Sequence, residues 1–188
     1  MHDLEPITAL WGTAPRVEEF QGLTISECPD WALASLAARH GQEDACASGA
    51  AGFLGADLPD VAKSVTEGRL TAFWTGPQQW MIEAPHASHE DLAAQLLAAV
   101  GESASVTEQT DGWVRFDLEG PRCHDVLERL CNADTRMMEQ DQVTRTQLAA
   151  LGTFLVCRGT DTHFSIIAPR SSAGSLHDSL VAAARSVI

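Results

Sequence analysis

Trp80-Met-Ile-Glu-Ala-Pro85 is matched, at an offset of 84 residues and without a gap, by Phe164-Ser-Ile-Ile-Ala-Pro169. The match continues through identical residues: Ser88 with Ser172, Leu92 with Leu176, Leu96 with Leu180, and Ala98-Ala99 with Ala182-Ala183. In each half this pattern predicts a strand that ends at proline, a turn, and a helix with one apolar stripe. Such a unit also recurs by chance in α+β proteins. The match therefore predicts the same structural unit twice and favours, without requiring, a duplication.

Around this stretch, the first half of the chain alternates strand and helix patterns. Strands are expected at 22–27, 70–74, 79–84 and 104–109, and helices at 30–40 and 88–101. The order βαββαβ is that of the split βαβ, ferredoxin-like unit. Residues 42–68 are rich in Ala, Gly, Ser and Asp and are expected to form a loop with at most one short turn of helix. Residues 1–21 have no clear period and are expected to form an extended arm.

The second half begins in the same way. Strands are expected at 112–118, 143–148, 154–157 and 163–168, with helices at 120–131 and from about Leu176 to Ala184. The predicted fold class is therefore α+β, with two ferredoxin-like units of mixed, mostly antiparallel sheets and helices on one face. The expected division is an arm at 1–21, a first subdomain at 22–109 and a second at 110–188.

Charge excludes two classes of partner. The 188 residues hold 26 acids and 12 bases, a formal charge of −14, which repels nucleic acid and anionic membranes. The chain has neither an apolar run of about 18 residues nor a signal-peptide pattern, so a cytoplasmic protein is expected. Residues 1–110 carry 16 acids and 4 bases, and residues 111–188 carry 10 acids and 8 arginines. This split indicates either a solvated acidic surface or an arginine-bearing half that packs on a partner.

The candidates for chemistry are weak. Five cysteines at irregular spacings predict buried thiols, not a disulfide ladder or a metal pair. His86 and His89 have no further ligand nearby and are expected at the surface. Cys123-His124 could form a reactive thiolate, but Cys123 is expected to face inward. An anion could bind at 170–174, where a helix start is the favoured interpretation. We therefore predict no catalytic, cofactor-binding or metal-binding residue on this chain.

Several strings resemble a known family. Asp111-Gly-Trp-Val-Arg-Phe-Asp-Leu-Glu-Gly120, continuing to Leu130-Cys-Asn-Ala-Asp134, resembles the opening of the folate-binding fold of aminomethyltransferases. The strings at 30–38, 73–85, 108–113 and 169–175 together resemble the gamma subunit of heterotetrameric sarcosine oxidase. The resemblance covers roughly residues 5–188, and its most specific parts are 73–85 and 109–120.

The resemblance implies a helper subunit in an oxidoreductase complex. In that family the alpha and beta subunits carry FAD, FMN, NAD and the tetrahydrofolate site, and the delta subunit carries zinc. The complex demethylates sarcosine to glycine, yielding hydrogen peroxide and either formaldehyde or 5,10-methylenetetrahydrofolate. Aminomethyltransferases place an acidic pair before the strand matching 154–157, whereas this chain has Leu151-Gly152-Thr153. The isolated chain is therefore expected to lack folate chemistry and to hold no cofactor.

The predicted function is thus a non-catalytic gamma subunit that supports assembly with alpha, beta and delta subunits. Six interface candidates follow from the charge split and the N-terminal arm: Trp11, Arg115, Arg122, Arg129, Arg136 and Arg170. One alternative is the corresponding subunit of N-methylglutamate dehydrogenase, which sequence barely separates from the first. Another, of a different class, is a stand-alone folate-binding or aminomethyltransferase-like protein.

Overall fold

The computed structural model describes residues 6–188 and divides the chain into two compact units. Unit 1 combines the chain up to Pro29 with Asp111–Ile188, and unit 2 is Asp30–Thr110. The expected division placed boundaries at 22 and 110, whereas these units meet after Pro29 and after Thr110. Residues 22–29 were expected in the first subdomain, but the strand Leu23–Glu27 within them pairs with a strand of the second half, Trp113–Glu119.

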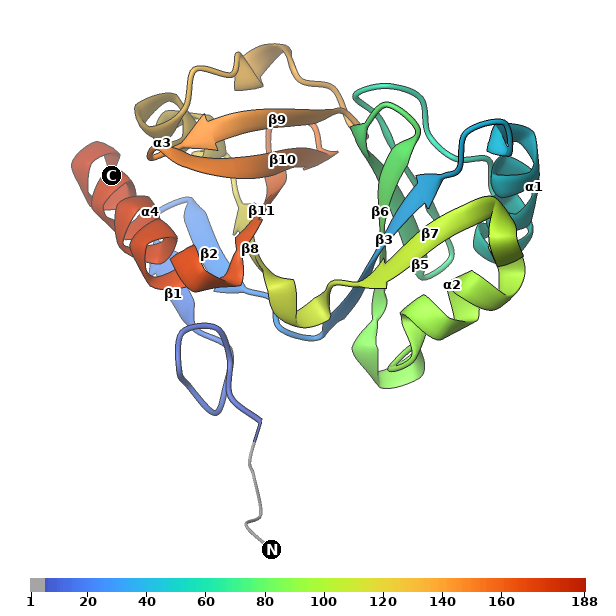
Figure 1. Ribbon diagram of the computed structural model, residues 1–188. Coiled ribbons are helices and arrows are strands. Elements are labelled where there is room, and N and C mark those ends of the chain that lie inside the picture. Colours follow the sequence, from blue (N-terminus) through green and yellow to red (C-terminus); the bar gives the residue numbers. More distant parts are fainter. Residues whose placement is uncertain (1–5) are drawn as a thin grey trace, which may run out of the picture. The chain divides into compact units, whose positions relative to one another are not determined.

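Unit 2 is a five-stranded antiparallel sheet with two helices on one face (Figure 1). The strands lie in the order β4-β5-β6-β3-β7. Their bounds are β3 Trp31–Ala38, β4 Ser64–Glu67, β5 Leu70–Gly76, β6 Gln79–Pro85 and β7 Ala104–Glu108, and the helices are α1 Glu43–Leu54 and α2 Leu92–Val100. Without the short edge strand β4, the order βαββαβ is the predicted ferredoxin-like one.

Two elements of unit 2 differ from expectation. The expected helix 30–40 is the strand β3, which lies between β6 and β7. Ala32, Ala34 and Leu36 face the core, but the opposite face carries Leu33 and Ala37, so the sequence lacks the apolar–polar alternation that marks a strand. The segment 42–68, expected to be mostly loop, contains the helix α1. Its buried stripe is Cys46, Ala50 and Leu54, and because two of these side chains are small the apolar periodicity is weak in the sequence.

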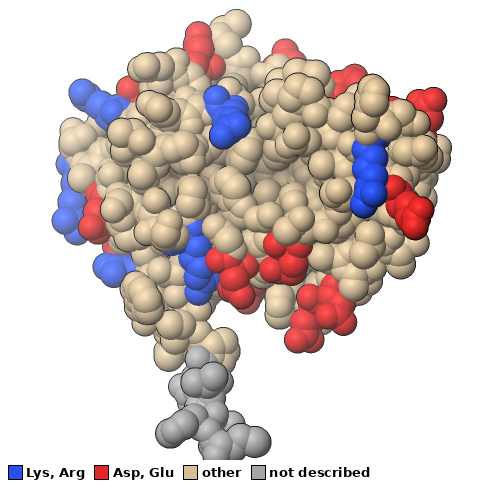
Figure 2. All heavy atoms as spheres, viewed as in Figure 1, with Lys and Arg blue, Asp and Glu red and all other residues tan. Residues whose placement is uncertain are grey.

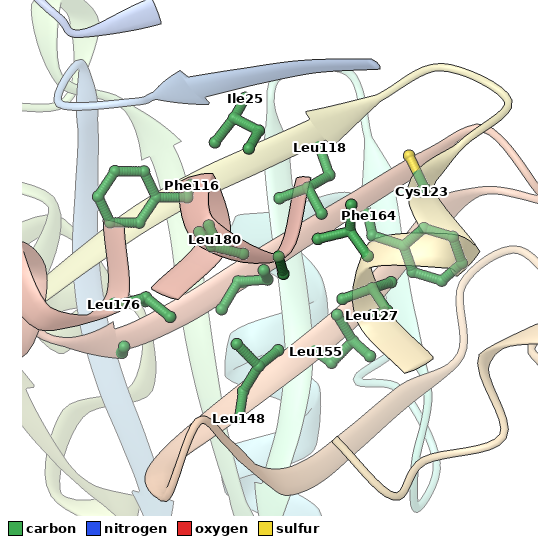
Figure 3. Packing of buried hydrophobic residues seen from close by; sticks show 14 of the residues in the cluster. Ile25, Phe116, Leu118, Cys123, Leu127, Leu148, Leu155, Phe164, Leu176 and Leu180 are labelled. Carbon is green, nitrogen blue, oxygen red and sulfur yellow. The ribbon is translucent and has the colours of Figure 1, made fainter. Parts of the chain in front are cut away.

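Unit 1 is a six-stranded antiparallel sheet in the order β1-β2-β8-β11-β10-β9. Its strands are β1 Val17–Phe20, β2 Leu23–Glu27, β8 Trp113–Glu119, β9 Val143–Leu148, β10 Leu151–Gly159 and β11 His163–Pro169, and its helices are α3 Cys123–Leu130 and α4 Ala173–Val187. Figure 3 shows Phe116 of β8, Leu155 of β10 and Leu180 of α4 gathered in the core between sheet and helices. The expected arm 1–21 is thus a strand over its last residues.

The two units share one plan, as the internal match predicted. The series β3-α1-β4-β5-β6-α2 corresponds to β8-α3-β9-β10-β11-α4, and both β6 and β11 end at proline before a single 3-10 turn. The place beside the first strand is filled differently. β7 follows α2 and pairs with β3, whereas β2, from the N-terminal side, pairs with β8. The strand at 22–27 therefore completes unit 1 and not unit 2.

Within residues 6–188, no helix has both the length and the apolarity needed to cross a bilayer. The domain division also changes the charge distribution. Unit 2 carries 11 acids and 3 bases, and the two segments of unit 1 carry 15 acids and 9 bases. The strong asymmetry counted along the sequence is therefore smaller between the folded units, because the acidic N-terminal segment joins the arginine-bearing half.

Candidate functional site

The loop before β1 presents an indole ring to solvent. Trp11 is 84% exposed, and its backbone has a φ of 65°, which is uncommon for a residue with a side chain. Three hydrogen bonds close the loop: the Thr8 N–H donates to the Gly12 carbonyl at 2.8 Å, the Trp11 N–H to the Thr8 carbonyl at 3.1 Å, and the Gly12 N–H to Thr8 Oγ1 at 3.3 Å. Backbone strain of this kind clusters at ligand-binding and partner-binding sites.

A buried carboxylate fixes this loop to the sheet. Glu27, at the end of β2, is 3% exposed and accepts hydrogen bonds from the N–H of Leu10 at 3.0 Å and of Arg16 at 3.2 Å. Its own N–H donates to the Arg16 carbonyl at 2.8 Å. A carboxylate satisfied by backbone N–H groups is well suited to hold an irregular segment. The position of Trp11 is thereby set before any partner binds.

Beside Trp11 lies a groove of about 480 Å³. It is lined by Ile7, Thr8, Ala9, Trp11, Asp111, Gly112, Arg170, Ser171 and Gly174. Arg170, in the turn before α4, donates from Nη2 to the Ile7 carbonyl at 3.1 Å, and its Nη1 lies 3.7 Å from Asp111 Oδ1. The fold therefore brings together Trp11 and Arg170, two of the six interface candidates, and adds the half-exposed Ile7. Trp and Arg are the residue types that dominate binding energy at protein interfaces.

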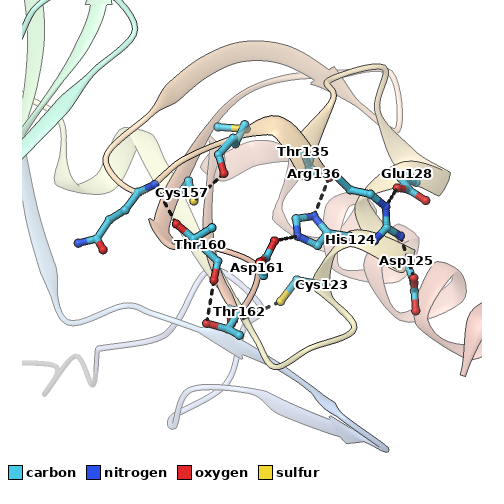
Figure 4. A network of polar contacts seen from close by, with 12 residues as sticks. Cys123, His124, Asp125, Glu128, Thr135, Arg136, Cys157, Thr160, Asp161 and Thr162 are labelled. Carbon is cyan, nitrogen blue, oxygen red and sulfur yellow. Dashed lines mark hydrogen bonds and ion pairs between the residues drawn. The ribbon is translucent and has the colours of Figure 1, made fainter.

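Two further candidates, Arg122 and Arg136, converge on one acid at the start of α3. Arg122 Nε donates to Asp125 Oδ2 at 2.7 Å, and Arg136 Nη2 donates to Asp125 Oδ1 at 3.3 Å. Arg136 also pairs with Glu128, as Figure 4 shows. These bonds lower the pKa of Asp125, the largest contribution being the hydrogen bond from Arg122. Both guanidinium groups are therefore already engaged within the chain, although both remain partly exposed.

Arg129 and Arg115 lie at opposite extremes of exposure. Arg129 is exposed on α3, and its guanidinium forms no hydrogen bond or ion pair with any residue from 6 to 188. Arg115, in contrast, is 7% exposed on β8. Its Nε and Nη2 donate to the two carboxylate oxygens of Asp117 at 2.8 and 2.7 Å. Arg115 was expected at a partner interface. That place stays a prediction, and within this chain the Arg115 guanidinium is buried and bound by a carboxylate on the same strand face.

Asp117 is the centre of a polar cluster on β8 and β11. Besides Arg115, it accepts from Ser165 Oγ at 2.6 Å and lies 3.3 Å from His163 Nε2. Burial alone would raise the pKa of Asp117, but the hydrogen bonds from His163, Arg115 and Ser165, with the charge of Arg115, hold it well below its ordinary value. Asp117 is thus a permanently ionised partner for Arg115, not a group that exchanges protons near neutral pH.

A second chain of hydrogen bonds superficially resembles a hydrolase triad (Figure 4). His124 joins Thr135 Oγ1 and Asp161 Oδ1, each at 3.0 Å. The hydroxyl that would act as nucleophile belongs to a residue only 1% exposed, whereas the Asp161 side chain is 68% exposed. This accessibility is the reverse of what nucleophilic catalysis needs. The three residues instead tie α3 to two separate turns.

The Cys123 thiol and His86, two further candidates from the sequence, lie in surroundings that do not favour catalysis. Cys123 is buried, as expected, and burial together with the charge of Glu119 raises its pKa to about 12, which opposes a reactive thiolate. All five cysteines are free. Across residues 6–188, no group of three or more His, Cys, Asp or Glu side chains is placed to hold a metal ion. His86 is exposed in the turn after β6.

Residues missed from sequence are Glu27 and Asp117. Nothing local marks Glu27, since the backbone that it anchors is irregular. Asp117 had a signal, because Arg115 and Asp117 are two apart on a strand and so share one face.

Figure 2 shows that basic side chains on the visible face are scattered and do not form one patch.

Comparisons with known proteins support the fold. No family model and no curated protein matches the chain. Among solved structures, it is similar to a chain of heterotetrameric sarcosine oxidase from Corynebacterium sp. U-96 in complex with pyrrole 2-carboxylate. The identity is 23%, the TM-score is 0.77, and the match covers 88% of this chain and 85% of that one.

The chain is also similar to the glycine cleavage system aminomethyltransferase T from Bartonella henselae, with 17% identity and a TM-score of 0.60. That match covers 86% of this chain but 48% of the aminomethyltransferase, so the chain spans about half of that protein. Together the two similarities confirm the predicted α+β, aminomethyltransferase-like fold.

Proposed function

We propose that this chain is a non-catalytic subunit of a heterotetrameric oxidoreductase complex, namely the gamma subunit of a sarcosine oxidase. The observation that carries the proposal is the end-to-end similarity to one chain of such an enzyme, 88% of this chain against 85% of that one. The aminomethyltransferase is matched over only 48% of its length, which favours an accessory chain over an independent transferase.

The chemistry of the residues supports a helper role. The acidic pair that the aminomethyltransferase resemblance implies is replaced by Leu151-Gly152-Thr153, where β10 begins. In the triad-like chain of Thr135, His124 and Asp161, the Thr135 hydroxyl that would have to act as nucleophile is buried. Partner contact, by comparison, has a suitable surface: Trp11 held on a rigid loop beside a groove that also contains Arg170.

The assembly role is tested by omission. The alpha, beta and delta subunits expressed without this chain should give a complex of low assembly mass or low stability, and restoring the chain should restore both. A normal mass and full activity without the chain would contradict the helper role.

If the complete complex oxidises N-methylglutamate in preference to sarcosine, the chain belongs to the alternative enzyme. Saturable tetrahydrofolate binding by the isolated chain would contradict a non-catalytic subunit.

Trp11→Ala should weaken association of this chain with its partners by about 30-fold, because truncating a central tryptophan anchor costs about 2 kcal/mol or more. The measurement is the dissociation constant of the complex by sedimentation, with the unfolding midpoint of the isolated variant as a check. That midpoint should not move, since the ring is exposed. Met137→Ala is the matched control, because Met137 is a 75% exposed apolar side chain of the same unit outside the groove. Equal affinities for both variants would remove Trp11 from the interface.

A further inference from the structure

Unit 2 contains a second, larger groove, remote in sequence from the Trp11 loop. Its volume is about 580 Å³. Its lining comes from three segments: the first half of α1, the loop 57–61, and the end of the β5–β6 hairpin with Trp74 and Trp80. That volume falls within the range of about 300–1,000 Å³ typical of ligand-binding pockets, so it can take a few residues of a peptide.

The groove is held open by the chain itself. Trp74 and Trp80 are directly opposite each other on β5 and β6, and both side chains are half-buried. The Trp80 indole N–H donates to the Pro59 carbonyl at 2.9 Å, which fixes the loop 57–61 against the hairpin. The backbone N–H of Trp74 donates to the carbonyl of Lys63, which follows the same loop, at 3.0 Å. Since the indole N–H of Trp80 is already used, its ring face is what remains for a ligand.

The rim of this groove is acidic. Glu43 and Asp44 come from the first turn of α1, and Asp57 and Asp60 come from the loop. No arginine, lysine or histidine is among the described residues that line it. Backbone hydrogen bonds at Glu43 and Gly41 lower the pKa of Glu43, so its charge is present near neutral pH. The groove therefore combines aromatic rings with four carboxylates, of which Glu43 lies 3.7 Å from the Nδ1 atom of His40, a residue outside the lining.

We propose that this groove binds an arginine-bearing segment of a partner protein chain. A guanidinium stacks on indole faces and forms paired hydrogen bonds with carboxylates, so both features of the groove fit one group. A metal ion fits less well, because no three acids within residues 6–188 are placed to hold one. The inference rests on the proposed function only in that it needs a partner chain.

The test uses the isolated full-length chain, so it does not depend on assembly of the oxidoreductase complex. The probe is an acetylated, amidated pentapeptide with two arginines flanked by leucines, titrated by calorimetry and tryptophan fluorescence. We expect saturable one-to-one binding. A peptide with citrulline in place of arginine, which keeps the shape and loses the charge, should bind at least fivefold more weakly.

Two double variants distinguish binding of the peptide in the groove from non-specific attraction of a cationic peptide to an acidic protein. Each of them removes two negative charges. Asp57→Asn/Asp60→Asn should weaken peptide binding at least fivefold. Glu90→Gln/Asp91→Asn, at exposed positions of the same unit outside the groove, should change it less than twofold. Absence of saturable binding, equal binding of the citrulline peptide, or equal weakening by both variants would overturn the proposal. The tests of Trp11 and of subunit omission would remain valid in any of these cases.

Discussion

Asp117→Asn should lower the free energy of unfolding by about 3–5 kcal/mol, the cost of removing one partner of a buried ion pair. Arg115 is 7% and Asp117 8% exposed, and two hydrogen bonds of 2.7–2.8 Å join them. The asparagine keeps the size of the side chain but replaces the charged acceptor of two Arg115 hydrogen bonds with a neutral amide. Urea unfolding at pH 7, followed by circular dichroism, measures the difference.

The pH dependence of this deficit follows from the lowered pKa of Asp117. A carboxyl whose pKa is depressed in the folded state stabilises the protein above its unfolded pKa, which is about 4. As the pH falls below that value, the unfolded chain takes up a proton that the folded chain does not. The wild-type protein thereby loses stability that the variant never had. The deficit should thus be constant between pH 8 and pH 5 and should shrink on further acidification.

Asp125→Asn is the matched control for this prediction. Asp125 also accepts hydrogen bonds from arginines, but its side chain is 33% exposed, and exposed pairs contribute about 0–1 kcal/mol. The double variant Arg115→Met/Asp117→Leu should recover most of the lost stability, because apolar pairs replace buried ion pairs well. A loss at Asp117 no larger than that at Asp125 would show that the buried pair does not stabilise unit 1.

Gly120→Ala should lower the free energy of unfolding by about 2–6 kcal/mol, since backbone strain and steric overlap each contribute about 1–3 kcal/mol. Gly120 has a φ of 126°, and a Cβ atom there would lie 2.4 Å from the Gly22 carbonyl oxygen. The clash is with backbone on the β1–β2 hairpin, so no side chain can rotate away. Thermal unfolding of the full chain measures the effect.

Gly174→Ala is the control for Gly120→Ala. Gly174 lies in the first turn of α4, its φ is not in the left-handed region, and a Cβ atom there meets nothing within 4 Å. This variant should be neutral or stabilising by up to about 1 kcal/mol, because alanine favours helix more than glycine does. A similar loss for both variants would show that β2 does not approach Gly120 closely in solution.

Local chemistry explains which elements were predictable. The helices α2, α3 and α4 each follow a turn and carry an apolar stripe, and the strand β9 has the bounds 143–148 that its pattern predicted. One local detail was wrong: the helix expected from residue 88 begins at Leu92, and the Ser88 hydroxyl donates to the Pro85 carbonyl. A hydrogen bond between side chain and backbone depends on a few degrees of dihedral angle, which sequence spacing does not determine.

By itself, the sequence determined that the chain contains two copies of one α+β unit, because periodicity, prolines and apolar stripes act over neighbouring residues. Only the tertiary structure decided three other features. β3 is a strand and not a helix because it pairs with β6 on one side and with β7 on the other. β2 joins unit 1 because the edge beside β8 has no strand from its own half. Trp11 is held on its loop because Glu27 of β2 accepts from the Leu10 N–H, and the Arg115–Asp117 pair is supported by Ser165 of β11, which donates to Asp117. Each of these features depends on contacts between segments that are distant in the sequence, and a local sequence pattern does not determine such contacts.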